Sequence, residues 1–165
     1  AGGKSMPNHC HNRVTVYSSG NDNDESRAQI AKLKQIFEDE NCFTQIIPEP
    51  DWQNMPLLTS DNRFTKYGND GELPQYVEDP WRRLVFKSTG ISDQRWYDWR
   101  VNHWGTKWDC YDVVVTDEDP DQFEVEFNTA WAPPEPICHA IRDEYPDLAI
   151  SWFYDEPGCE LAGYL

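Results

Sequence analysis

The spacing of hydrophobic residues changes several times along the chain, and each change predicts a new element. Val14 and Val16 alternate with polar residues over 12–18, which is the period of a half-buried β-strand. Over 24–40 the apolar residues recur three and four positions apart, which predicts a helix with one buried face. A short apolar run at 43–47, followed by prolines, predicts a second strand.

Two predicted helices have candidate end signals. Asp24 or Ser26 is the expected N-cap of the first helix, because a short oxygen-bearing side chain there accepts a hydrogen bond from a free backbone amide. Ser92 is the expected N-cap of another helix over 93–104. Gly105 follows that helix at the position that favours a left-handed backbone.

The aromatic residues of this later helix form one stripe. Trp96, Trp99, His103 and Trp104 stand at i, i+3, i+7 and i+8, so they share one helix face. Four of the chain's eight tryptophans lie within thirteen residues here. The helical spacing favours core packing of the first three of these tryptophans over a ligand-binding role, and it leaves the turn at 105–108 as candidate surface.

The C-terminal third predicts a hairpin, a helix and a strand. A strand over 113–116, a turn over 117–121 and a strand over 123–128 form the hairpin. A helix that ends at Tyr145 and a last strand over 149–154 follow. On the second hairpin strand, Phe123, Val125 and Phe127 are expected to face the core, and Glu124 and Glu126 to face water.

The order of these elements predicts an α+β domain of ferredoxin-like architecture, with an antiparallel sheet of about four strands and helices on one face. Between about 48 and 91 the periodicity disappears, so this stretch is expected to be an irregular insertion with short helical pieces. A single domain is expected over 6–165. Residues 1–5 are expected to be left over from expression, in front of a natural start at Met6.

Composition indicates a protein of the cytosol. Charged residues make up 27% of the chain, and no signal peptide is visible. No run approaches the roughly eighteen apolar residues of a membrane helix. The five cysteines are widely spaced and never form a CxxC pair, so reduced thiols are expected.

The negative charge is concentrated near the C-terminus. The formal net charge is −16, and fifteen of the thirty acidic residues but only one of the fourteen basic residues follow Trp108. The residues after Trp108 therefore carry −14, and the first 108 carry −2. A field of this sign repels nucleic acid and attracts basic surfaces. A surface that serves only solubility has the same composition.

Four ordered segments resemble the YubB ferredoxin-like domain family, whose members are carried largely by phages and plasmids. The segments are Met6-Pro7-Asn8, Trp104-Gly105-Thr106-Lys107-Trp108-Asp109, Thr129-Ala130-Trp131-Ala132-Pro133-Pro134 and Tyr154-Asp155-Glu156-Pro157-Gly158. The resemblance spans essentially all of 6–165 and implies a ferredoxin-like domain, without implying a settled biochemical role. The chain departs from the family pattern at His9, where an aromatic residue is expected.

The acidic third suggests a binding function. Carboxylates can imitate the phosphate charge of a nucleic-acid duplex and occupy the basic groove of a defence protein, and complementary charge speeds such an encounter. The leading hypothesis is a non-enzymatic phage or plasmid protein of the host cytosol that inhibits a nucleic-acid-directed defence, such as restriction or CRISPR. Its partner is a host protein with a basic surface, and neither a membrane nor a cofactor is involved. The expected contact residues are Asp117, Glu118, Asp119, Asp121, Glu124, Glu126, Asp143, Glu144, Asp147, Asp155 and Glu156.

An island of basic and aromatic residues supports a second hypothesis, single-stranded nucleic-acid binding. Six basic but only two acidic residues lie between Trp81 and Trp108, and nucleic-acid bases stack on tryptophan in single-strand binding proteins. Arg95, Arg100, Lys107 and Trp108 would then carry the binding. The acidic third opposes this hypothesis, because affinity for phosphate depends on neutralising its charge.

A third hypothesis is a hydrolase or carbohydrate binder. Asp98, Asp109 and Asp112 lie near aromatic residues, as carboxylates do in glycosidases. Thirty acidic residues produce such neighbours by chance, and no nucleophile elbow, phosphate-binding glycine loop or HExxH motif is present. The hypothesis requires a pocket lined by Trp99 or Trp108 and two carboxylates.

Neighbouring histidines and cysteines are the remaining candidate, a metal site. His9, Cys10 and His11 would have to meet Cys138 and His139. Their spacing fits no standard zinc pattern, so partly buried thiols and surface histidines are expected, and no metal is assigned.

Overall fold

The computed structural model describes residues 8–20, 23–58 and 71–165, apart from the side chains of Asp117 and Glu118. The chain forms two compact units, one from Ala1–Pro48 with Val101–Leu165 and one from Glu49–Arg100. The expected start at Met6, the residues before it and positions 59–70 of the expected insertion lie outside the described residues.

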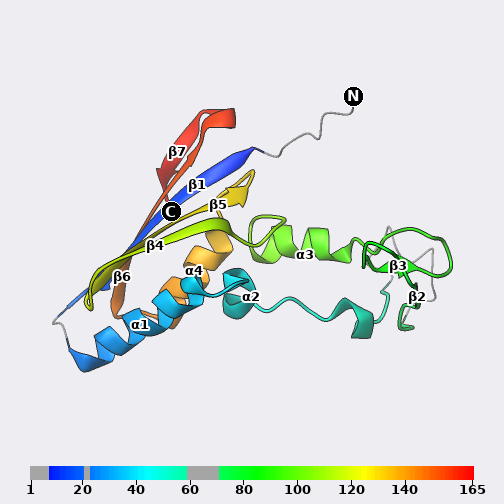
Figure 1. Cartoon of the computed structure of the whole chain (residues 1–165), viewed down its shortest axis with the longest axis horizontal. Helices are drawn as coiled ribbons and strands as arrows, with labels where there is room; N and C mark the ends of the chain where they lie inside the picture. Colours follow the sequence, from blue (N-terminus) through cyan, green and yellow to red (C-terminus); the bar gives the residue numbers. More distant parts are fainter. Residues whose placement is uncertain (1–7, 21–22, 59–70) are drawn as a thin grey trace. The chain divides into compact units, whose positions relative to one another are not determined.

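The first unit is built on a five-stranded antiparallel sheet (Figure 1). Its strands are β1 (His9–Ser18), β4 (Tyr111–Asp119), β5 (Gln122–Ala130), β6 (Leu148–Glu156) and β7 (Leu161–Tyr164). They lie in the order β4-β5-β1-β6-β7, and every neighbouring pair is antiparallel. The first four strands of this order, with a helix after β1 and after β5, confirm the predicted ferredoxin-like α+β class.

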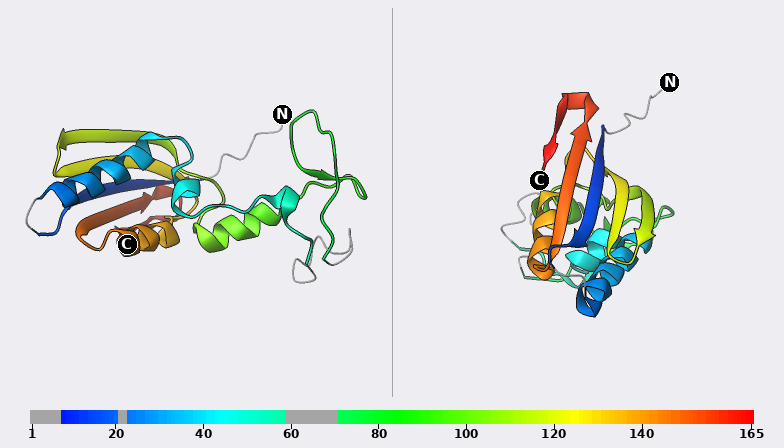
Figure 2. Two further views of the ribbon diagram at one scale, coloured as in Figure 1. Left: turned by 90° about the horizontal axis from the view of Figure 1, so that it is seen from below. Right: turned by 90° about the vertical axis from the view of Figure 1, so that its left-hand side faces the viewer.

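Helices α1 (Asp24–Glu38), α2 (Cys42–Ile46) and α4 (Glu135–Glu144) lie on one face of this sheet (Figure 2). The N-cap of α1 is Asn23, whose side chain accepts from the amide of Ser26, while the Ser26 hydroxyl accepts from the Asn23 amide. The predicted caps were therefore wrong by one to three positions. Ser26 takes part in the cap as its third helical residue.

The core follows the predicted alternation along the strands. Val14 and Val16 of β1 and Phe123, Val125 and Phe127 of β5 point to the helices and are at most 2% exposed. Phe127 is the centre of an aromatic cluster, with its ring centroid 5.7 Å from Phe37, 6.0 Å from Phe43 and 5.6 Å from Trp152. Among the described residues no helix lies over the opposite face of the sheet (Figure 2), and Arg13 and Glu126 on that face are exposed.

A buried polar chain links the three central strands. The indole of Trp152 donates to Asn12 Oδ1 at 3.0 Å, and Asn12 Nδ2 donates to Thr129 Oγ1 at 3.0 Å. Thr129 in turn donates to the carbonyl of Ala132 at 2.7 Å. Each of these groups has a partner, so burial of the chain does not incur the cost of an unsatisfied polar atom.

The second predicted strand, 43–47, is wrong, because residues 43–46 belong to helix α2 and Ile47 is its C-cap. The carboxylate of Asp109 accepts from the amides of Phe43 and Thr44 at 3.0 and 3.2 Å. It replaces the N-cap side chain that α2 lacks, since Asn41 makes no side-chain cap. The local sequence pattern cannot reveal a helix cap that is supplied by a residue so distant in the chain.

Helix α3 (Arg95–His103) is shorter than the predicted 93–104, and Ser92 does not cap it. Of its aromatic stripe only Trp104, the residue after the helix, enters the core at 1% exposure. Trp96 and Trp99 are half-buried and His103 is exposed, so the expectation that all three tryptophans are core residues was too broad.

Trp104, Gly105 and Thr106 form a tight turn against the start of α4. The indole of Trp104 donates to the carbonyl of Ile47 at 2.9 Å, and Thr106 donates to the carbonyl of Ala130 at 2.9 Å. Gly105 has the predicted left-handed backbone, with φ at +81°. A Cβ atom there would lie 2.9 Å from Cδ of Pro136, which leaves no room for a side chain.

The sheet extends beyond the sequence prediction at two places. β4 continues to Asp119, so the expected turn at 117–121 shrinks to its last residues. β7 was not predicted, because Leu161 and Tyr164 are 57% and 73% exposed and its sequence shows no buried alternation. It pairs with β6 at the edge of the sheet.

The cysteines depart from the expected reduced state. Cys42 and Cys110 are joined as a disulfide across a sequence separation of 68. Cys10 and Cys138 are buried thiols and Cys159 is an exposed thiol.

The second unit contains η1 (Trp52–Asn54) and the strand pair β2 (Tyr76–Val77) and β3 (Val85–Phe86). Leu57 and Phe86, both 2% exposed, pack with Tyr76. The described part of the insertion, expected to be irregular with short helical pieces, thus contains a 3-10 turn, a short hairpin and a small core of its own.

Arg95 ties the segments of the second unit together. Its guanidinium pairs with Asp93 at 2.9 Å and donates to the carbonyls of Trp52 and Met55 at 2.9 and 3.0 Å. Tyr76 donates to the same carboxylate at 2.7 Å. Burial and this hydrogen bond raise the pKa of Tyr76 above its usual value, so the phenol stays a donor across the physiological range.

The Gly105→Ala variant tests the turn before α4. A left-handed alanine and its contact with Pro136 are expected to destabilise the protein by about 2 kcal/mol. Urea unfolding followed by tryptophan fluorescence measures the change. Gly20→Ala is the control, because a Cβ at Gly20 meets nothing within 4 Å, and equal stabilities of the two variants would contradict the account.

The Arg95→Met variant tests the centre of the second unit. Loss of the guanidinium leaves the Asp93 carboxylate buried and unpaired, a change expected to cost about 3–5 kcal/mol. Amide hydrogen exchange over 71–100 should accelerate, while exchange in β1 and β5 stays slow. Arg83→Met is the matched control, since the Arg83 guanidinium is exposed in its pair with Asp79 and its loss should leave stability nearly unchanged. An Arg95→Met protein as protected as the control would refute this role.

Candidate functional site

Five of the fifteen acidic residues that follow Trp108 gather at one end of the first unit. Tyr17, near the end of β1, pairs with Gln122 on one side and Ala149 on the other. The β4–β5 turn and the α4–β6 loop therefore lie at the same end of the sheet, and the first turn of α1 is joined to it through Arg27 (Figure 1). We call this region the acidic end, and its carboxylates are Asp24, Glu25, Asp119, Asp121, Asp143, Glu144 and Asp147.

Few basic groups offset this charge. Arg27 pairs with Asp121 at 2.7 Å, and Arg142 donates to the carbonyls of Ile150 and Leu165, at 2.9 Å each, instead of to a carboxylate. Among the described residues, no basic side chain lies within ion-pairing distance of the exposed Asp143, Glu144 or Asp147. The acidic end therefore projects net negative charge into solvent.

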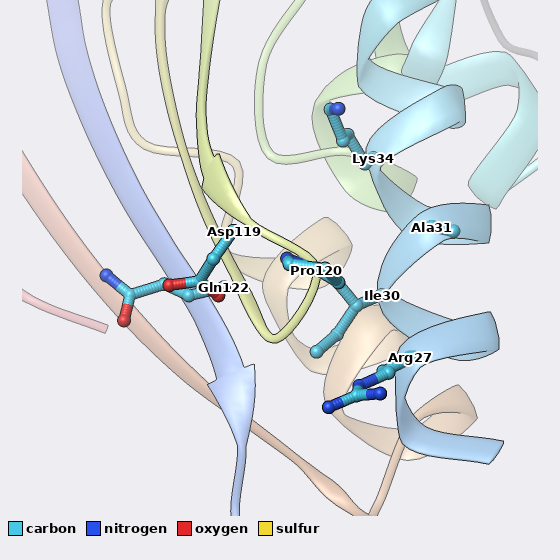
Figure 3. Close-up of a pocket in the computed structure, with 7 residues that line it drawn as sticks. All are labelled: Arg27, Ile30, Ala31, Lys34, Asp119, Pro120 and Gln122. Atoms are coloured by element: carbon cyan, nitrogen blue, oxygen red, sulfur yellow. The ribbon is translucent and has the colours of Figure 1, made fainter. Parts of the chain in front are cut away.

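A hollow of about 390 Å³ separates α1 from the β4–β5 turn (Figure 3). Arg27 and Lys34 from α1 line it opposite Asp119 and Pro120. Its walls carry both positive and negative side chains, so the charges of the residues that line it offset one another beside the acidic end. These lining residues form no concentrated anion-binding or catalytic group.

The open face of the sheet carries three more of the predicted acids. Glu124 and Glu126 lie on β5 beside Arg13 of β1, with Arg13 Nε 2.9 Å from Glu126 and 3.9 Å from Glu124. The hydrogen bond that Arg13 donates to Glu126, with the charge of both carboxylates, raises the pKa of Arg13. Asp155 of β6 lines the same face with Glu126, around a hollow of about 350 Å³. One arginine thus serves several carboxylates, and the face stays acidic.

Histidine and amide side chains form a row across this face. His11 Nδ1 lies 2.5 Å from Asn128 Oδ1, and Asn128 Nδ2 donates to Asp112 at 3.2 Å. His9 is hydrogen-bonded to Tyr111 on the same side. Burial, with the charge of Asp112, raises the pKa of Tyr111, which keeps this hydroxyl neutral. These hydrogen bonds hold the polar side chains of the row in fixed positions on the surface, and Asp112 is one of the groups that they hold.

Not every predicted contact residue is available. Glu156 is 3% exposed, and its Oε1 has no hydrogen-bond partner among the described residues, so its assignment to the contact surface was wrong. It alternates inward on β6, where sequence periodicity also predicts a buried position. Asp117 and Glu118 lie on β4, and their side chains are outside the described part of the chain.

Asp24 and Glu25 belong to the acidic end but were missed from the sequence. They sit in the first turn of α1, where acidic side chains favour the helix dipole, so their local pattern indicates a helix start. Only the packing of α1 beside the β4–β5 turn gives them a second role.

The residues of the nucleic-acid hypothesis are largely engaged within the protein. Arg95 is 5% exposed and paired with Asp93, so it cannot contact a nucleic acid as predicted. Arg100 pairs with Glu49 at 2.8 Å and lies 4.8 Å from the ring centroid of Trp96. Lys107 Nζ lies 4.4 Å from the ring centroid of Trp108, which is the aromatic residue among these four and is 38% exposed.

The carboxylates of the hydrolase hypothesis have structural partners in two of three cases. Asp109 caps α2 and Asp112 accepts from Asn128, whereas Asp98 is exposed on α3. The three hollows described in the structure are lined by neither Trp99 nor Trp108.

The histidines and cysteines considered for a metal do not gather into the group that was considered. In the described residues, the cluster of possible ligands is instead Cys42, Asp109 and Cys110, whose ligand atoms lie within 4.8 Å of one another. No helix in the described part of the chain is long and apolar enough to cross a membrane.

Comparison with known proteins bears on the C-terminal part of the chain. Residues 104–165 match the model of a family described as the ferredoxin-like domain in Api92-like protein. This segment begins at the Trp104 turn and contains β4 to β7 with α4. It includes three of the four segments that carried the sequence resemblance; Met6-Pro7-Asn8 lies outside it.

Two individual proteins are similar to the chain. The protein YubB of Escherichia coli (strain K12), described as uncharacterized, is 28% identical over 69 residues, which are 41% of this chain and 48% of that protein. The chain thus spans about half the length of this curated relative. The crystal structure of a protein api92 from Yersinia pseudotuberculosis has a TM-score of 0.47 at 11% identity, over 96% of this chain and 93% of that chain. Residues 104–165 are therefore similar to the ferredoxin-like domain of Api92-like proteins, and part of the chain is similar to YubB, in agreement with the resemblance found in the sequence.

Proposed function

We propose that this chain is a non-enzymatic binding protein that holds a basic surface of another protein. The acidic end is the primary contact, and the open sheet face extends it. The observation that supports this proposal is the charge of the acidic end, where exposed carboxylates such as Asp143, Glu144 and Asp147 lack basic partners in the described structure. Uncompensated charges of one sign repel one another and lower the stability of the fold. Binding of a basic partner would explain why the protein keeps them.

The partner is proposed to be a nucleic-acid-binding protein. Its basic groove is shaped for a surface that presents repeated negative charges, and carboxylates on turns and strand faces can take the place of phosphates. Such an encounter is steered by long-range attraction and is fast at low salt. The resemblance to proteins of phages and plasmids points to a host defence, restriction or CRISPR, as the target in the cytosol.

Single-strand binding is the weaker alternative. Arg95 and Arg100 already hold Asp93 and Glu49 within the second unit. A phosphate backbone would also have to approach a protein of net charge −16. Lys107 and Trp108 supply the remaining argument for it, since an accessible indole beside a cation can stack on a base.

Reversal of charge at the acidic end tests the proposed contact. The double variant Asp143→Lys and Asp147→Lys should bind the captured host partner at least about tenfold more weakly, which corresponds to about 1.4 kcal/mol. The matched control is Asp39→Lys with Glu40→Lys, which makes the same change in net charge at the other end of α1. The measurement is affinity purification from host cytosol at low salt, followed by titration of the identified partner.

Duplex DNA distinguishes a mimic from a general acidic binder. If the chain occupies a nucleic-acid groove, a short DNA duplex should elute the partner from the immobilised chain. Capture of no basic nucleic-acid-binding protein, or a partner that DNA does not displace, would count against mimicry. Equal weakening by both double variants would mean that only net charge matters and that the acidic end is not the contact.

Tryptophan fluorescence tests the single-strand alternative directly. Addition of a single-stranded oligonucleotide should leave the emission unchanged, because the acidic field prevents binding. Quenching that disappears in a Trp108→Ala variant, with Trp131→Ala as the control for loss of another exposed indole, would instead favour the alternative.

A further inference from the structure

Two cysteines from distant parts of the sequence meet in the first unit, one before and one after the segment that forms the second unit. Cys42 opens α2, and Cys110 immediately precedes β4. Cys42 lies before the segment Glu49–Arg100 and Cys110 lies after it, so their bond closes a loop that contains the whole second unit. A cross-link with this placement restrains both connecting segments at once.

The surroundings of the pair favour a disulfide over a metal site. Asp109 is the third possible ligand, but its Oδ1 accepts from the amides of Phe43 and Cys110 at 3.0 and 2.8 Å. Its Oδ2 accepts from the amide and hydroxyl of Thr44, at 3.2 Å each. A carboxylate with about four lone-pair positions is then saturated. Metal coordination would have to remove the cap from α2.

The two cysteines differ in exposure. Cys42 is 1% exposed, whereas Cys110 is half-buried. Both line a hollow of about 590 Å³ whose other walls include Glu38, Asp39 and Glu40. A small reagent that enters this hollow can therefore reach Cys110 first, in a field that stays negative because Lys34 pairs with one of the three carboxylates, Glu38, at 3.6 Å.

The other cysteines are poor competitors for the same chemistry. Burial raises the pKa of Cys10 to about 11 and also raises the pKa of Cys138, so both stay protonated at neutral pH. Cys159 is exposed and must be removed in any clean test.

We infer that Cys42 and Cys110 are a redox modification site, a dithiol that is oxidised reversibly by small disulfides and preferentially by cationic ones. The Cys110 thiolate attacks one sulfur of the reagent RSSR, forms a mixed disulfide and releases the first RS⁻. Cys42, after loss of its proton, attacks the Cys110 sulfur and releases the second RS⁻. The protein dithiol loses two electrons and two protons, and the reagent gains both as two RSH molecules. Excess thiol reverses each step.

The oxidised and reduced forms should differ in the segments that lead to the second unit. The disulfide restricts the unfolded chain and holds α2 against the residue before β4. Oxidation should raise the urea midpoint of unfolding by roughly 1 M. It should also slow amide exchange over 42–48 and 101–110. This inference is independent of the acidic end and of any binding partner.

The experiment uses the full chain with Cys159→Ser as the starting protein. Reduced protein is exposed to cystamine, hydroxyethyl disulfide or oxidised glutathione, quenched with an alkylating reagent and mapped by mass spectrometry. We expect the 42–110 cross-link to form, with cystamine about tenfold faster than oxidised glutathione at low salt and a smaller ratio at high salt. The triple change Glu38→Gln, Asp39→Asn and Glu40→Gln should reduce this preference.

Single variants test the order of attack. Cys42→Ser should accumulate a mixed disulfide at Cys110, whereas Cys110→Ser should leave Cys42 unmodified in the folded protein. If either variant fails to fold, the reduced starting protein provides the same information, because Cys110 should be alkylated before Cys42. Absence of the 42–110 cross-link, or prior modification of Cys42, would overturn the inference. Stoichiometric retention of added Zn²⁺ with protection of both thiols would overturn it in favour of a metal site.

Discussion

The packing of the Trp104–Thr106 turn against the start of α4 is the constraint on which the first unit depends. Trp104 places its indole in the core while Gly105, with its left-handed backbone, allows the chain to approach Pro136 without a side chain. Thr106 then bonds to the end of β5. These contacts bring the chain back from the second unit at the correct position to begin β4. Trp104, Gly105 and Thr106 belong to one of the segments that carry the family resemblance, and these contacts give that segment a structural role.

The same stretch organises the other connection to the second unit. Asp109 caps α2, and Cys110 is bonded to Cys42 at the start of that helix. The outgoing and returning chain segments are thus fastened to each other by hydrogen bonds and a covalent bond. An insertion of some fifty residues can be accommodated in this way with little disturbance of the sheet, since its ends are held in place by the first unit.

The uncompensated carboxylates lie apart from the contacts that hold the fold together. The groups that secure the fold, such as Asp109 and the Asp93–Arg95 pair, are buried or hydrogen-bonded, whereas the carboxylates of the acidic end and the open face lie toward solvent. A buried charge without a partner destabilises a protein strongly, but an exposed one does so only weakly. The chain can therefore carry a large negative charge on one part of its surface while its core and its turns remain satisfied.

Local sequence determined those features that depend on neighbouring residues. Alternation predicted β1 and β5, helical spacing predicted α1 and α4, and the glycine at 105 marked the end of a helix. The sequence also showed the negative charge of the C-terminal third. It did not show that several of these carboxylates lie together at one end of the sheet. Tertiary structure decided the rest, because the responsible partners are distant in the chain. Asp109 caps α2, whose residues the local pattern predicted as a strand, and pairing with β6 makes a strand of β7.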